Sequence, residues 1–241
     1  MEQRFLEKLN AETQRLVRKI EEFASVEIEV RPTPAPSSGT AAHAKAVALL
    51  ASEDGATLLY RDEQEFGTQS VLHELLHLHR YWVDFVPQLL PLEDPDGDKT
   101  MIAHQVENTL EHLVIVPKEA EYGLEPYAQL NETTRKIWQD YPWPDISEPW
   151  ARRKNAFLNW LTTHFLVNDA GVMAMAQQAL TQEALLEEAK SFTDKIARVV
   201  GSKEHCISTA IRFLHIPRQE ATLAYLDIRN KAFLKKPIPE H

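Results

Sequence analysis

The sequence predicts an α+β protein that is mostly helical, and three observations support this class. Long amphipathic stretches fill the second half of the chain, Gly is scarce at 7 of 241 residues, and strand-like patterns are confined to the first 60 residues. A composition of 44% hydrophobic and 26% charged residues is typical of a globular protein. We expect a core with a small antiparallel sheet over residues 1–130 and a helical extension over 131–241, which could share that core.

The first 60 residues carry one helical pattern and two strand patterns. Apolar side chains fall close to one helical stripe over residues 2–24, and strict alternation over 26–30 predicts a half-buried strand. Residues 45–60 predict a β-hairpin around a turn at 53–55. A helix over 41–51 is the alternative, because Ala and Leu are strong helix formers.

The rest of the chain is predicted to be helical except where prolines cluster. A helix is expected over 68–86 with Thr68 as its cap, and another over 100–116 that stops at Pro117. Residues 118–150 contain several prolines and are expected to be irregular. The remaining helices are predicted over 150–167, 170–179, 181–200, 203–214 and 217–235.

Charge and hydropathy argue against several classes of partner. A net charge of −10 would repel phosphate backbones, which argues against nucleic acid as a partner. No apolar run approaches the length of a membrane span, and the first residues lack the apolar segment of a signal peptide. Cys206 is the one cysteine, and we expect it to be a small core residue. These features favour a cytoplasmic protein.

The strongest chemical signal is the motif H-E-x-x-H, formed by His73, Glu74 and His77. Residues four apart lie on one face of a helix, so both imidazoles can bind one Zn²⁺ ion. Glu74 is rotated off that line, where it could act as a general base toward a metal-activated water. A pair of solvated histidines on an amphipathic helix is the alternative interpretation.

A third metal ligand is expected on the helix over 100–116. His104, Glu107 and Glu111 form one stripe there, which could also be simply the solvated face of the helix. We favour Glu107 as the ligand, with Glu111 as the alternative, and either Glu111 or His104 could orient a ligand. Asp96, 19 residues after His77, is a weaker candidate in a loop.

Hydrolysis of a peptide bond also needs a group that stabilises the developing oxyanion. Tyr81 lies four residues after His77 and could face the same cleft, whereas His79 points to another side of the helix. The full set of candidates is His79, Arg80, Tyr81, His104 and His112.

The segment HELLHLH, followed about thirty residues later by ENTLEHLVIVP, resembles the ImmA/IrrE family of bacterial and phage zinc peptidases. The resemblance covers roughly residues 45–120. It implies a zincin-like core in which His73, His77 and Glu107 bind Zn²⁺ and Glu74 is the general base. It also implies that the substrates are regulatory proteins of the cytoplasm.

Together these features predict a zinc-dependent peptidase that acts on a protein or peptide. A non-catalytic zinc-binding sensor or interaction module is the alternative, and a fourth protein ligand such as His104 would favour it. A zinc hydrolase with a different substrate is a third option. The C-terminal helices could cover the cleft, bind a regulator or form a dimer.

Overall fold

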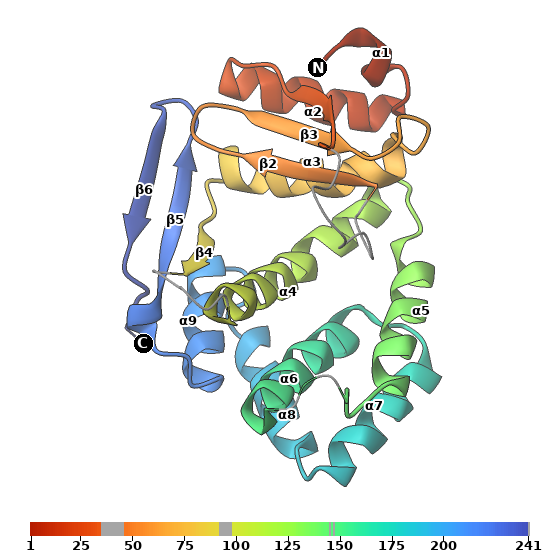
Figure 1. Cartoon of the computed structure of the whole chain (residues 1–241), viewed down its shortest axis with the longest axis vertical. Coiled ribbons are helices and arrows are strands. Elements are labelled where there is room, and N and C mark those ends of the chain that lie inside the picture. Colours follow the sequence, from red (N-terminus) through yellow and green to blue (C-terminus); the bar gives the residue numbers. More distant parts are fainter. Residues whose placement is uncertain (35–45, 92–97, 145, 147, 241) are drawn as a thin grey trace. The chain divides into compact units, whose positions relative to one another are not determined.

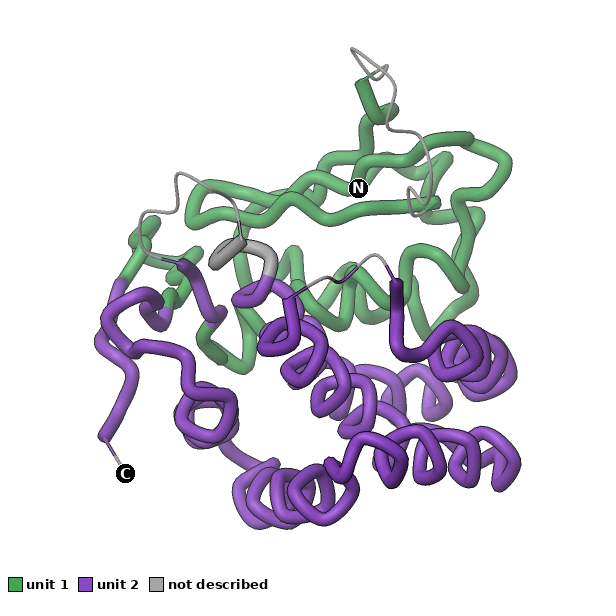
Figure 2. Tube along the Cα trace, turned by 60° about the horizontal axis from the view of Figure 1, so that its bottom comes forward, with its two compact units in different colours: residues 1–87, 224–234 green, residues 88–223, 235–241 purple. Residues whose placement is uncertain are grey.

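The computed structural model describes residues 1–34, 46–91, 98–144, 146 and 148–240. It confirms an α+β protein that is mostly helical. The chain forms two compact units, one of residues 1–87 with 224–234 and one of residues 88–223 with 235–241 (Figure 2). The helix that begins at Asp98 packs on the later helices and belongs with them to the second unit.

The first unit contains a three-stranded sheet with the order β1-β3-β2 (Figure 1). β2 and β3 are antiparallel, with Val47 opposite Tyr60 and Ala51 opposite Ala56, so the predicted hairpin is confirmed. The helical alternative is wrong over residues 47–51. β1 is parallel to β3. The strands are β1 (Glu29–Pro32), β2 (Val47–Ala51) and β3 (Ala56–Tyr60).

The predicted helix over 2–24 forms two helices, because Asn10 adopts the extended backbone conformation of an N-cap and starts a second helix. The Asn10 side chain accepts a hydrogen bond from the Thr13 N–H, which caps the second helix. The third helix of this unit begins after Gly67, whose backbone is extended, so the predicted cap Thr68 is its first residue. This helix packs against β2, β3 and α2. The helices are α1 (Gln3–Leu6), α2 (Ala11–Ala24) and α3 (Thr68–Trp82).

The second unit is built mainly of helices around a long central one (Figure 1). That helix, α4, packs against α5, α6, α9 and the short strand β4. Large side chains such as Trp160 and Phe192 are fully buried in this unit. The elements are β4 (Gln88–Pro91), α4 (Asp98–Glu121), α5 (Pro126–Gln139), α6 (Pro149–Leu166), α7 (Ala170–Gln182), α8 (Leu186–Ala197) and α9 (Lys203–Phe213).

Two predictions based on proline were wrong. α4 continues through Pro117 to Glu121, although proline lacks the N–H that a helix interior uses. α5 forms inside the segment expected to be irregular, because Pro126 occupies the first helical turn, where a missing N–H costs nothing. The predicted helix over 181–200 begins later, because Ala184 has a positive φ and separates α7 from α8.

The predicted helix over 217–235 is also wrong. The segment instead forms a single 3₁₀ turn, η1 (Arg218–Glu220), and two strands, β5 (Ala221–Asp227) and β6 (Ala232–Lys236). The sheet order is β4-β5-β6. Six successive residues of β5 are buried, so its side chains do not alternate between core and solvent. A run of side chains that are all buried fits a buried strand and a buried helix equally well.

Two simpler predictions can be compared directly with the structure. Cys206 is buried in α9, as expected, with its Sγ 3.3 Å from the Val199 carbonyl oxygen. In the described ranges no helix combines the length and the apolar character that crossing a bilayer requires.

Asp169 is the N-cap of α7, and several donors stabilise its carboxylate. Its Oδ1 accepts hydrogen bonds from the Val172 N–H at 3.1 Å and from the Gly171 N–H at 2.8 Å, and Arg135 pairs with Oδ2. The Val172 N–H first, then the Gly171 N–H and the Arg135 guanidinium, hold the pKa of the Asp169 carboxyl below its usual value.

We predict that Asp169→Asn lowers the unfolding temperature at neutral pH, because Asn keeps the cap but loses the charge. The folded-state pKa lies below the unfolded value of about 3.9, so the stabilisation is complete above that value. It disappears as the pH falls through the folded-state pKa. Thermal unfolding measured from pH 7 downward should show the gap to the parent protein narrowing in acid. Asp169→Ala, which removes both the cap and the charge, is the control. A difference in unfolding temperature between Asp169→Asn and the parent protein that stays constant with pH would contradict the role of the charge.

Candidate metal centre

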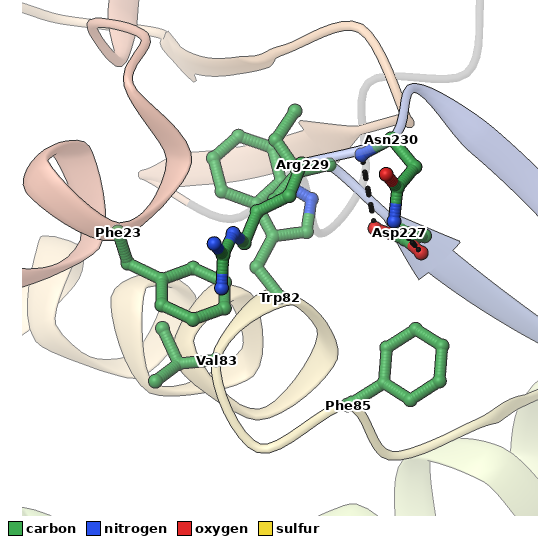
Figure 3. A pocket seen from close by; sticks show the side chains of 8 residues that line it. Phe23, Trp82, Val83, Phe85, Asp227, Arg229 and Asn230 are labelled. Atoms are coloured by element: carbon green, nitrogen blue, oxygen red, sulfur yellow. Dashed lines mark hydrogen bonds between the residues drawn. The ribbon is translucent and has the colours of Figure 1, made fainter.

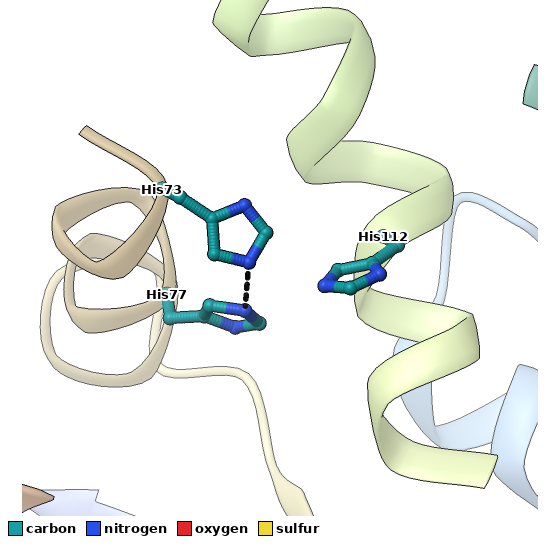
Figure 4. A group of neighbouring side chains, drawn as sticks. All are labelled: His73, His77 and His112. Atoms are coloured by element: carbon teal, nitrogen blue, oxygen red, sulfur yellow. Dashed lines mark hydrogen bonds between the residues drawn. The ribbon is translucent and has the colours of Figure 1, made fainter. Parts of the chain in front are cut away.

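α3 places the two motif histidines on successive turns of one helical face. Their Nε2 atoms are 3.3 Å apart, and the ring planes meet at 75° with centroids 4.9 Å apart (Figure 4). Two nitrogens that each bind Zn²⁺ at 2.0–2.1 Å with a tetrahedral angle are separated by about 3.3–3.4 Å. The spacing of His73 and His77 therefore suits two ligands of one ion.

Tyr81, one turn further along α3, contacts the other edge of the His77 ring. Its hydroxyl oxygen is 3.4 Å from His77 Nδ1, and the two rings are stacked with centroids 5.9 Å apart. If Nδ1 carries the proton, it donates to the hydroxyl and Nε2 keeps the lone pair that binds a metal. Tyr81, predicted as an oxyanion candidate, is thus better placed to orient His77.

Figure 4 labels one further histidine besides this pair, His112, which lies in the second unit. His112 belongs to α4, and its Nδ1 is 3.4 Å from the side-chain nitrogen of Asn108. Sequence reasoning considered His112 only for the oxyanion. The missed signal is that three histidines are a known ligand set for catalytic zinc.

The predicted ligand Glu107 and its alternative Glu111 are instead engaged with Lys203 of α9. The Lys203 Nζ lies 2.8 Å from Glu107 Oε1 and also pairs with Glu111 Oε1. The Leu89 N–H donates to Glu107 Oε2 at 2.9 Å. The side chains of Lys203, Glu107 and Glu111 are 3%, 11% and 0% exposed, so this ion triad is buried within the second unit. Sequence could not show it, because Lys203 lies 96 residues after Glu107.

The other predicted site residues are scattered. Glu74 is buried on α3 next to His73, with 5% of its surface exposed. His79 Nδ1 lies 3.4 Å from Asp84 Oδ2, just beyond the end of α3. His104 is exposed on α4, and Asp96 lies outside the described residues.

Comparison with known proteins gave no match to any family model, curated protein or solved structure. The resemblance to the ImmA/IrrE family therefore depends on the two sequence motifs alone. The function of the chain has to be argued from the chemistry of its side chains.

We predict that Lys203→Met destabilises the fold by about 3–5 kcal/mol, because it removes the ammonium group that pairs with two buried carboxylates. Urea unfolding measures this loss as a lower midpoint. Lys190→Met is the matched control, since Lys190 pairs with Glu187 on the exposed face of α8 and should matter little.

A triple variant separates the charge effect from lost packing. Lys203→Met combined with Glu107→Gln and Glu111→Met removes all three charges and keeps an acceptor for the Leu89 N–H. It should recover most of the stability, because an apolar replacement of a buried ion group is often neutral. If the triple variant is no more stable than Lys203→Met, the loss comes from packing and the charge explanation fails.

Proposed function

We propose that this chain is a zinc-dependent peptidase whose ion is held by His73 and His77 of α3. The observation that carries the proposal is the 3.3 Å separation of their Nε2 atoms, with buried Glu74 beside His73 in the motif. Neutral imidazole nitrogens are common zinc ligands. The two Nε2 atoms already have the separation that zinc requires, so α3 would not need to change its backbone conformation to bind the ion. A cytoplasmic location remains part of the proposal.

The residues of α3 divide the chemical work between them. A bound Zn²⁺ ion would supply Lewis acidity and lower the pKa of a water molecule to about 7. Glu74 would accept the proton of that water and pass it to the leaving amine. Tyr81 would keep His77 in the tautomer that offers Nε2.

A peptide substrate is supported by the sheet next to α3. β2 is an edge strand, and in the part of the chain that the structure describes it pairs only with β3. An extended peptide can add to such an edge through backbone hydrogen bonds. Since α3 packs against β2, a peptide bound there would lie along the element that neighbours the histidine pair.

We predict that Glu74→Gln binds zinc like the parent protein but loses at least about a hundredfold in peptide hydrolysis, the typical contribution of a general base. His77→Ala should lose the metal itself. Zinc content measured by atomic absorption, and cleavage of an unstructured protein such as casein, would report the two effects. His164→Ala on α6 is the control, because His164 is exposed and has no ligand spacing. Normal cleavage by Glu74→Gln would remove Glu74 from the mechanism.

The third ligand can be tested separately from the pair. If His112 is the third ligand, His112→Ala should weaken zinc binding at least about tenfold, the scale on which even supporting residues act. Glu107→Gln should leave affinity unchanged if Lys203 holds that carboxylate. Competition with a chromogenic chelator measures both. Weaker binding in Glu107→Gln alone would instead support the ligand set implied by the ImmA/IrrE resemblance.

The alternative, a non-catalytic zinc site, is favoured by one observation. Both carboxylates expected to complete a His₂Glu site are paired with Lys203. A zinc-loaded chain that cleaves no protein, and whose Glu74→Gln variant behaves identically, would support this alternative.

A further inference from the structure

The first unit contains a pocket of about 490 Å³ that the proposed metal site does not use (Figure 3). It lies where the end of α2, the end of α3 and the turn after β5 come together. Three aromatic rings and one guanidinium contribute to its wall. They belong to Phe23, Trp82, Phe85 and Arg229.

Arg229 is the positive group of this pocket. Its guanidinium carbon lies 5.6 Å from the centre of the Phe23 ring, and its side chain is exposed. Among the described residues no carboxylate lies within ion-pair distance of Arg229. A guanidinium that stacks on a ring still presents several N–H donors in a fork that matches a carboxylate.

Asp227, the acidic group of the pocket, already has its own partners. The Asn230 N–H donates to Oδ1 at 3.1 Å, and the Asn230 side chain donates to Oδ2 at 2.8 Å (Figure 3). The Asn230 side chain, more than any other group, lowers the pKa of Asp227. Asp227 therefore shapes the turn that carries Arg229, and both of its oxygens have donors.

Phe85 is held at the pocket in an unfavourable backbone conformation. Its φ is +53°, a region that favours Gly and Asn, and 39% of the residue is exposed. The ring contacts Tyr225 with centroids 5.2 Å apart. A large apolar side chain that is both strained and exposed is a feature of ligand sites, where such strain persists because it serves binding.

The rigid side of the pocket is formed by Trp82. This residue is 1% exposed, and its Nε1 donates to the Ser52 carbonyl oxygen at 3.2 Å. The indole ring is therefore fixed before any ligand arrives. The lining combines apolar side chains with the polar groups of Asp227, Arg229 and Asn230, and the volume falls in the usual range of small-ligand pockets.

We propose that this pocket binds a carboxylate carried on a large apolar group, either a free acid or the C-terminal residue of a peptide. The apolar group would pack against the exposed side chain of Phe85, and the carboxylate would pair with Arg229. A cationic ligand fits less well, because the guanidinium of Arg229 already occupies the face of Phe23. The proposal is independent of the metal centre.

Titration calorimetry of the full chain with three probes tests the charge preference. N-acetylphenylalanine should bind saturably, whereas its neutral amide and the cation phenethylamine should bind at least about tenfold more weakly, the scale of a charge-assisted contact. Equal binding of acid and amide, preference for the amine, or no binding of the acid would overturn the proposal.

Variants tie the binding to this pocket. Arg229→Gln should lower the affinity for N-acetylphenylalanine at least about tenfold and leave the unfolding temperature unchanged. Arg18→Gln, on the exposed face of α2, should bind the acid like the parent protein. Phe85→Gly should also weaken binding but not lower the unfolding temperature, since Gly adopts a positive φ freely. Unchanged affinity in both pocket variants would place the acid elsewhere and refute the proposal.

A hexapeptide ending in Phe, with a free or an amidated C-terminus, identifies the source of the carboxylate. Tighter binding of the free-ended peptide than of N-acetylphenylalanine would assign the pocket to peptide C-termini. Equal binding would assign it to small acids. Both results require the amidated peptide to bind more weakly, and a failure of that difference would contradict the proposal.

Discussion

Burial of charge is the constraint on which the helical unit depends. Glu107 and Glu111 lie one turn apart on the same face of α4, and neither carboxylate could be buried without a cation. Lys203 supplies it from the first turn of α9, whose N-cap is Ser202. The strand β4 joins the same arrangement through the Leu89 N–H. The Lys203 ammonium group therefore connects α9 to α4, and the hydrogen bond to Glu107 adds β4 to the same cluster.

In the first unit, the pair of histidines on α3 depends on the periodicity of the helix. The four-residue spacing of His73 and His77 brings two imidazoles together without any long-range contact. Tyr81 extends the same face by one more turn and fixes the orientation of His77. A metal-binding pair of this kind needs only a stable helix, which the packing of α3 against β2, β3 and α2 provides.

Sequence predicted what is local and missed what depends on distant partners. The hairpin of β2 and β3, the helix α3 and the paired histidines all follow from spacing over fewer than twenty residues. β5 was mistaken for a helix because a strand buried on both faces loses its alternation. The pairing of Glu107 with Lys203 could not be predicted, because Lys203 is 96 residues away and carries no motif.

Glu111 and His112 are neighbours on α4, and their side chains leave the helix about 100° apart in projection. Glu111 is fully buried against Lys203, and this contact restricts the rotation of α4 about its own axis. The same contact therefore restricts the direction in which the His112 side chain leaves the helix. The ion pairs that compensate the buried charges of the helical unit thus also limit the rotation of α4. Lys203 therefore influences the orientation of the His112 side chain on α4 through its ion pair with the neighbouring Glu111.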